Sequence, residues 1–263
     1  MLPFGITDLE FVLVTYVSAS IGIGLVVLAS RWVKLRYLAA FAVGVYLWYF
    51  TDTLGDANFL DVNSGFVLST DLVALFVLFV IGLAFFFSLD GEIFRSDSVQ
   101  KGGMLIAALA ALALGLHGFG EGADFGTTAA GTTYQTILDA FGGLAPSASW
   151  VLHKMMEPTL AAVCYVAFAG VGSKKGGEKL TDVLSVSLIF VIPAVVGSVI
   201  GYYVIFDHTY VFALGLGASI YALARVTKSL YSSDAGGSWL SLKMALAVAL
   251  GFLLIFISAL LHS

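Results

Sequence analysis

Three pairs of metal-binding residue types recur at one spacing along this sequence. The members of each pair are four residues apart: His117 with Glu121, His153 with Glu157, and Asp52 with Asp56. Residues four apart on an α-helix lie on the same side of it, one turn from each other. Imidazole and carboxylate groups bind Zn²⁺, and the same donors suit Fe²⁺, Mn²⁺ and Co²⁺. The spacing therefore predicts a divalent metal site formed by His117, Glu121, His153 and Glu157.

Further ionisable residues lie inside apolar stretches of the chain. Asp52, Asp56 and Asp71 are candidates for additional ligands or for the lining of an entrance, and Lys154 directly follows His153. An ionisable side chain inside a membrane is costly, so each of these residues is a functional hypothesis. A single histidine in such a position is more often a packing residue, but two matched pairs favour metal ligation.

The composition excludes several classes of protein. Of the 263 residues, 60% are hydrophobic and 11% are charged, and the mean hydropathy is +1.00. A soluble domain carries about 25% Asp, Glu, Lys and Arg, so this chain has too little charge to cover a globular surface. Nucleic-acid binding needs a basic face and a disulfide scaffold needs several cysteines, whereas Cys164 is alone. We therefore expect a membrane protein whose main partner is the lipid bilayer.

Eight apolar runs are long enough to cross a bilayer as helices. They are approximately 9–30, 37–54, 66–89, 103–125, 147–171, 183–206, 210–230 and 239–261. Continuous runs favour helices over the alternating strands of a membrane barrel. Asp207 and His208 separate the sixth run from the seventh, and 127–143 predicts an external loop with a short interfacial helix. The sequence thus predicts one all-α, polytopic transmembrane domain over 1–263.

The cations support this count of spans. Eleven of the twelve Lys and Arg residues fall in or around alternate connections between the runs, and Lys154 is the exception. Short cytoplasmic loops collect Lys and Arg, so an even number of spans predicts that both termini lie outside a multi-pass cell-membrane protein. At about 1.5 Å per residue, Asp52, Asp71, His117 and His153 all come to about 8 to 9 Å below the outer membrane surface.

Three motifs resemble those of the ZIP (Zrt/Irt-like) metal transporters. The segment 117–122, His-Gly-Phe-Gly-Glu-Gly, is similar to the His-Asn-x-Pro-Glu-Gly motif of that family's fourth helix. The segment 153–157, His-Lys-Met-Met-Glu, resembles the fifth-helix motif, and 52–57 resembles the second-helix motif with acids at both ends. The family's eight helices and external termini match the predicted topology. The resemblance covers the whole chain in topology but only three short segments in motif.

The departures from the family pattern concern a second metal. Family members that bind two ions use the residue after each histidine and an acid in the sixth helix, but here those positions hold Gly118 and Lys154, and 183–206 contains no carboxylate. We therefore expect a single metal site. The Lys154 ammonium is a candidate substitute for the second ion, neutralising Glu121, Glu157 or Asp71; alternatively, it extends to the membrane interface.

The resemblance implies a transporter, not an enzyme, that moves divalent metal toward the cytoplasm. Zn²⁺ is the first expectation, followed by Fe²⁺, Mn²⁺ and Cd²⁺, and the ion is cargo rather than a resident cofactor. The resemblance also implies an elevator mechanism, in which helices one, four, five and six carry the ion past a scaffold of the other four helices. This scaffold commonly forms a homodimer. Two alternatives stay open: an intramembrane zinc hydrolase that acts on a lipid, and a metal-sensing membrane protein.

Histidine ligation predicts a pH dependence of transport. Ligands must be deprotonated to bind metal, so metal uptake should fall as the pH drops through the histidine range. The measurement is the initial uptake rate between about pH 7.5 and 5.5, which spans the unperturbed histidine pKa. A rate that stays constant over this interval would contradict ligation by His117 or His153.

Overall fold

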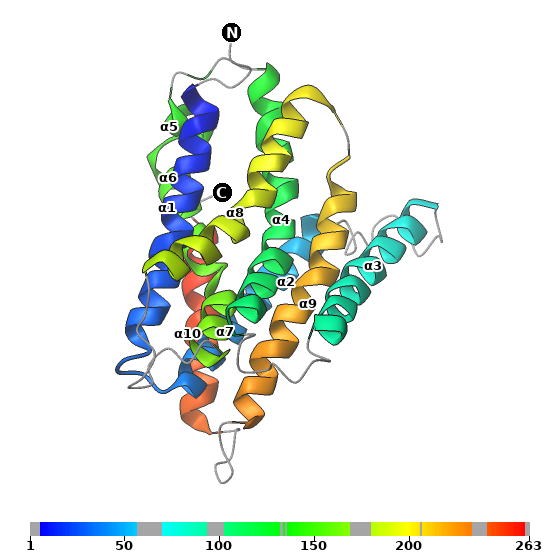
Figure 1. The fold of residues 1–263 in the computed structure, drawn as a ribbon. Coiled ribbons are helices and arrows are strands. Elements are labelled where there is room, and N and C mark those ends of the chain that lie inside the picture. The colour runs from blue at the N-terminus through cyan, green and yellow to red at the C-terminus, as the bar shows by residue number, and fades with distance from the viewer. Residues whose placement is uncertain are drawn as a thin grey trace.

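The described chain is a bundle of helices (Figure 1). The computed structural model describes residues 6–56, 70–93, 103–131, 134, 136–168, 180–205, 207–232 and 241–260. Within these ranges the regular elements are all helices. They are α1 (Ile6–Ala29), α2 (Leu35–Asp56), α3 (Thr70–Ile93), α4 (Gly103–Gly131), α5 (Ile137–Ala140), α6 (Leu144–Met156), α7 (Thr159–Phe168), α8 (Leu180–Tyr203), α9 (Thr209–Ser232) and α10 (Leu242–Ala259). The predicted all-α class is confirmed.

Seven helices of the described chain are long and apolar enough to cross a membrane. The apolar segments lie within α1, α2, α3, α4, α8, α9 and α10. Their apolar side chains are exposed over wide faces, as for Phe76 and Phe85 of α3 and Leu250 of α10, which fits contact with lipid and not with water. The chain is therefore a membrane-embedded helical protein.

The predicted span 147–171 differs from the structure, because it is not one continuous helix. It comprises α6 and α7, which are separated by a turn at Glu157 and Pro158. Proline has no N–H to donate to the carbonyl four residues earlier and its ring disfavours a continuous helix. Backbone hydrogen bonds close each side of the turn, from Glu157 N to His153 O at 3.0 Å and from Ala162 N to Pro158 O at 2.9 Å.

Two other boundaries show how tertiary contacts set helix ends. The predicted fourth span ends at 125, but α4 continues to Gly131 because α8 packs closely against its last turns: a Cβ on Gly126 would clash with the carbonyl oxygen of Ser198. The predicted break between the sixth and seventh spans is confirmed, since α8 ends at Tyr203 and α9 begins at Thr209. There, the Asp207 carboxylate accepts a hydrogen bond from the backbone N–H of Thr209 and so caps the start of α9. Hydrogen bonds from Thr209 also lower the pKa of this carboxyl.

Close backbone contact joins α4 to α8. A Cβ atom on Gly122 would clash with the carbonyl oxygen of Ala194, and a Cβ on Gly197 would clash with the carbonyl oxygen of Phe119. Small residues at such positions allow membrane helices to pack at short range, where apolar burial alone gives no preference for protein over lipid. This contact fixes the position of α4, which carries the first His–Glu pair.

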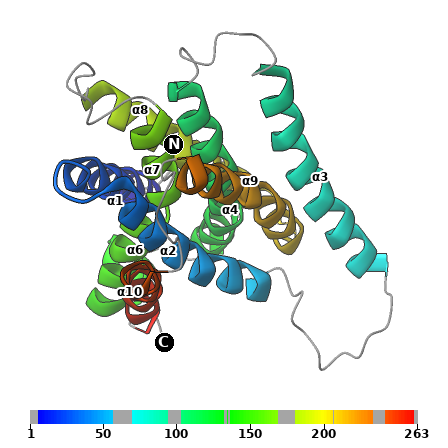
Figure 2. The same ribbon diagram turned by 90° about the horizontal axis from the view of Figure 1, so that it is seen from below.

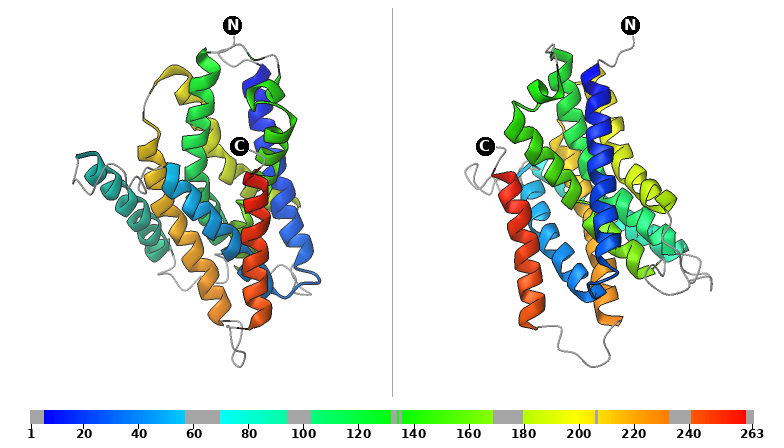
Figure 3. Two further views of the ribbon diagram at one scale, coloured as in Figure 1. Left: turned by 180° about the vertical axis from the view of Figure 1, so that it is seen from behind. Right: turned by 90° about the vertical axis from the view of Figure 1, so that its left-hand side faces the viewer.

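The helices form two groups at different heights. In one group α7 and α8 pack against α4, and α1 packs against α6, α7 and α8; in the other α2 packs with α10 and α3 with α9. Figures 1 and 3 show that α1 and α4 extend to one end of the bundle, called the upper end below, whereas α9 and α10 extend furthest toward the opposite end. Seen from below, α3 lies at the rim beside α9 (Figure 2). The two groups meet where α4 and α7 contact α9, where α7 contacts α2 and where α6 contacts α10.

Replacing Gly122 by alanine should destabilise the bundle. The added Cβ meets the Ala194 carbonyl, so we expect a loss of about 1 to 3 kcal/mol and a melting temperature lower by about 4 °C or more, measured by a fluorescence thermal melt in detergent. Gly24→Ala is the matched control, because nothing lies within 4 Å of a Cβ built at Gly24. Equal melting temperatures for both variants would contradict the role assigned to this contact.

Candidate metal centre

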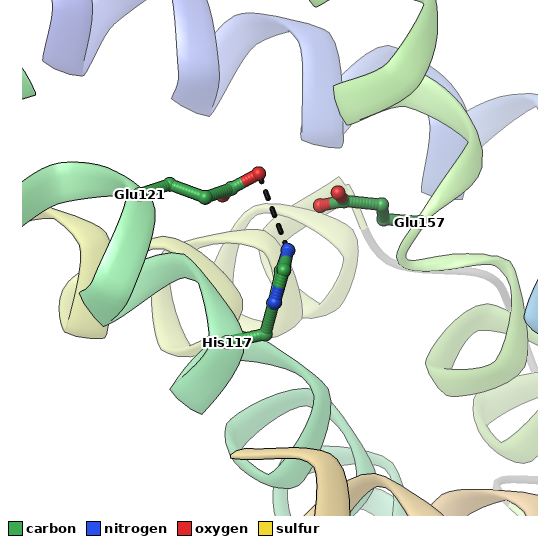
Figure 4. Close-up of side chains that lie close together, drawn as sticks. All are labelled: His117, Glu121 and Glu157. Atoms are coloured by element: carbon green, nitrogen blue, oxygen red, sulfur yellow. Dashed lines mark ion pairs between the residues drawn. The ribbon is translucent and has the colours of Figure 1, made fainter. Parts of the chain in front are cut away.

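A cluster of potential ligands lies inside the bundle, between the two helix groups. α4 contributes His117 and Glu121, and the turn between α6 and α7 contributes Glu157. One ligand atom from each residue can be chosen so that all three lie within 4.8 Å of one another. Figure 4 shows both carboxylates close to the His117 ring. We call these three residues the triad.

The triad is buried and its members contact each other. His117 and Glu157 are 1% and 4% exposed, and the Glu121 side chain is 15% exposed. Nε2 of His117 lies 3.3 Å from Oε1 of Glu121, as the spacing along α4 predicts. Two carboxylates and one imidazole with little access to water have a strong need for a cation.

Residues of α2 orient the His117 ring from the other side. The Thr53 hydroxyl donates to the carbonyl of Tyr49 at 2.8 Å, and it also lies 3.2 Å from Nδ1 of His117. Because its proton is used toward Tyr49, the hydroxyl accepts the Nδ1–H of the imidazole. Nε2 faces Oε1 of Glu121 at 3.3 Å, a contact that needs a proton on Nε2, and a metal ion would replace that proton. A metal-binding histidine has this arrangement, in which the second nitrogen donates to a fixed partner.

Thr53 and Tyr49 are site residues that the sequence prediction did not include. The Tyr49 ring packs edge-on against the His117 ring with centroids 4.9 Å apart, and its hydroxyl donates to Leu114 O. Both residues are buried. Their spacing of four residues places them on one side of α2, and that shared spacing is the only signal for them in the sequence.

The Lys154 side chain lies between the two carboxylates of the triad. Its ammonium forms an ion pair with Glu121 and a second one with Glu157 at 2.7 Å, and the residue is 1% exposed. The ammonium also lies 4.7 Å from the centre of the Trp150 ring, in a cation–π contact. Lys154 therefore does not extend to the membrane interface, which is the alternative interpretation of the sequence.

The second predicted pair is formed by His153 and Glu157. Their side chains approach to 2.9 Å, from Nε2 to Oε1, and His153 is 8% exposed. Among the described residues, the group of potential ligands around His117 does not include His153. In this conformation His153 contacts Glu157 from outside the triad, and its role as a direct ligand stays a prediction.

The acids of the second and third spans have a different placement. Asp52 is partly exposed and neighbours Thr53, which is the residue of this helix turn that contacts His117. The side chains of Asp56 and Asp71 lie outside the described part of the structure. Participation of these three acids in ligation or entry stays a prediction.

The neighbours of Gly118 concern the expectation that there is no second metal site. A Cβ at Gly118 would meet Ala194 Cβ at 3.3 Å, so α8 presents an apolar group where a further ligand would be needed. Lys154 meanwhile occupies the other side of the two glutamates. The nearest polar atom to that Cβ position is Oε2 of Glu121 at 3.7 Å, and the expectation of a single metal ion stays a prediction.

A cavity joins this cluster to the upper end of the bundle. Its volume is about 500 Å³, and Glu121 is the member of the triad that lines it. The remaining wall consists of aromatic and polar side chains from α1, α4, α5, α6 and the start of α9: Phe11, Asp124, Phe125, Thr128, Tyr134, Phe141, Trp150, His208 and Phe212, with Ala140. Water and small ions can therefore reach Glu121 from this end.

Fold and site together define a membrane-embedded helical bundle with a buried His–Glu–Glu–Lys cluster. A scan against protein-family models and a search of curated proteins give no match to this chain. The resemblance to ZIP transporters therefore rests on the three sequence motifs and the predicted topology, and it stays a hypothesis.

Removing the Lys154 charge should destabilise the protein in the absence of metal. Lys154→Met leaves Glu121 and Glu157 buried without their common partner, and breaking such a pair costs about 3 to 5 kcal/mol. We expect a lower melting temperature, and we expect added Zn²⁺ to raise it more in the variant than in the parent, because the ion replaces the lost charge.

The matched control is Lys243→Met, which removes an exposed cation at the start of α10. This variant should melt with the parent and respond to Zn²⁺ as the parent does. Adding Glu121→Gln to Lys154→Met should recover part of the lost stability, since one uncompensated charge is removed. An unchanged melting temperature for Lys154→Met would contradict the structural role of the ion pairs.

Proposed function

We propose that the protein is a ZIP-like transporter that moves divalent metal ions across the cell membrane toward the cytoplasm. The observation that carries this proposal is the triad: the His117 imidazole and two carboxylates converge inside a membrane bundle. Zn²⁺ fits these donors well, and Fe²⁺, Mn²⁺ and Cd²⁺ are further candidates. With a 2+ ion bound, the charges of Glu121 and Glu157 are balanced.

Lys154 gives the site a property that suits transport. It holds the same two carboxylates that an ion would need, so an entering ion must displace the ammonium from at least one of them. This competition weakens binding and assists release. In the metal-free state the ammonium partly neutralises the site, which lowers the cost of moving the carboxylates through the membrane.

The two helix groups support an elevator motion. α1, α4, α6, α7 and α8 correspond to the carrier helices that the resemblance implies, and α2, α3, α9 and α10 correspond to the scaffold. The carrier group includes all members of the triad, and it is displaced toward the upper end relative to α9 and α10 (Figures 1 and 3). The positive-inside prediction identifies the upper end with the outer side, so this arrangement is outward-facing. A homodimer through the scaffold is part of the proposal.

The decisive experiment is metal uptake into proteoliposomes that contain a fluorescent chelator. The parent should show saturable uptake of Zn²⁺, and His117→Ala and Glu157→Gln should each reduce it about tenfold or more, the loss typical of disturbed metal sites. Asp139→Asn is the matched control, because it removes an acid of α5 outside the cluster. Parallel assays with Fe²⁺, Mn²⁺ and Cd²⁺ rank the ions.

Metal content of the purified protein separates the competing outcomes. We expect one Zn²⁺ per chain by equilibrium dialysis, and none in the His117→Ala variant. Bound metal without flux would overturn transport and redirect the search to lipid hydrolysis or metal sensing. Neither binding nor flux would overturn the metal site itself.

A further inference from the structure

The cavity at the upper end gives the triad a defined approach. Of the three triad residues only Glu121 lines this cavity. Below the triad, the chain is closely packed around the buried side chains of Tyr49, Leu114 and Leu160. An ion that enters or leaves in this conformation therefore passes through the cavity and meets Glu121 first.

Asp124 lies on this approach. It follows Glu121 by three residues on α4, so both carboxylates are on one side of the helix, with Asp124 about one turn nearer the upper end. It is exposed and lines the cavity, as does His208 at the start of α9. The Phe212 ring contacts both His208 and His117, with centroids 5.6 and 5.0 Å apart. The cavity wall thus offers the polar side chains of Asp124 and His208 in addition to Glu121 of the triad.

We propose that divalent cations reach the triad through this cavity and that Asp124, together with His208, captures them at its mouth. The inference rests on the proposed transport function and assigns the entry step to residues other than Asp52, Asp56 and Asp71. Asp124 acts here by attracting and positioning the ion rather than as a ligand of the triad.

The shape and charge of the cavity support capture of a hydrated ion. One water occupies about 30 Å³ of liquid, so a cavity of about 500 Å³ holds a cation with its first hydration shell. Acidic side chains in a cleft with low-dielectric walls raise the local concentration of cations, and aromatic residues form much of this wall. Because Lys154 already compensates Glu121, the Asp124 carboxylate supplies the attraction near the mouth.

The first test compares Asp124→Asn with Asp139→Asn in the uptake assay. Loss of the Asp124 charge should raise the KM for Zn²⁺ about three- to tenfold with kcat within about twofold of the parent, and the KM increase should shrink at high ionic strength. Asp139 lies at the same end but is not among the cavity residues, so its variant should behave as the parent does.

The second test uses thiol labelling. Cys164 is buried, so a cysteine introduced at Thr128 in the cavity wall gives a single accessible thiol. A membrane-impermeant alkylthiosulfonate added from the uptake side should label Thr128→Cys and block uptake. Ala148→Cys, at an exposed position of α6 outside the cavity, should be labelled without loss of uptake.

The outcomes distinguish this inference from the proposed function. If the parent transports Zn²⁺ but Asp124→Asn has the kinetics of the parent, or labelled Thr128→Cys still transports, the entry route is overturned while the transport function stands. If the parent neither binds nor transports metal, both proposals fail together. A KM effect confined to Asp124→Asn and a block confined to Thr128→Cys support the route.

Discussion

The buried ion network of Lys154, Glu121 and Glu157 is the constraint on which this structure depends. Each of these charges would be very costly alone inside an apolar bundle, and the network compensates them only while α4 and α6 keep their present positions. The turn at Pro158 places Glu157 toward α4, and Thr53 of α2 fixes the ring between the carboxylates. The ion pairs thus join α4 to α6 within one helix group, and the contact of Thr53 with His117 connects this cluster to α2 of the other group.

Packing elsewhere allows this network to form. The clash-free approach of α4 and α8 depends on Gly122 and Gly197, and the resulting contact leaves α4 free to face α2, α7 and α9 with its ionisable side. The same glycine-rich segment of α4 therefore serves both structure and site.

The cluster already holds a cation of the protein itself. Lys154 pairs with two of the three triad residues, and α8 presents Ala194 beside Gly118. Any metal ion would therefore compete with the ammonium for Glu121 and Glu157. Glu121 also lines a cavity, so the cluster is not fully enclosed.

Long apolar runs and four-residue spacing are local properties, so the helical class, most helix positions and both His–Glu pairs could be predicted from the amino-acid sequence. The packing of the helices against each other decided which of these residues are in contact. The partners of Lys154, the contact of Thr53 instead of Asp52 with His117, the contact of His153 with Glu157 from outside the triad and the cavity beside Asp124 all depend on how helices are rotated and shifted against each other. Helix periodicity fixes which residues share a face, but only packing between helices decides which faces meet.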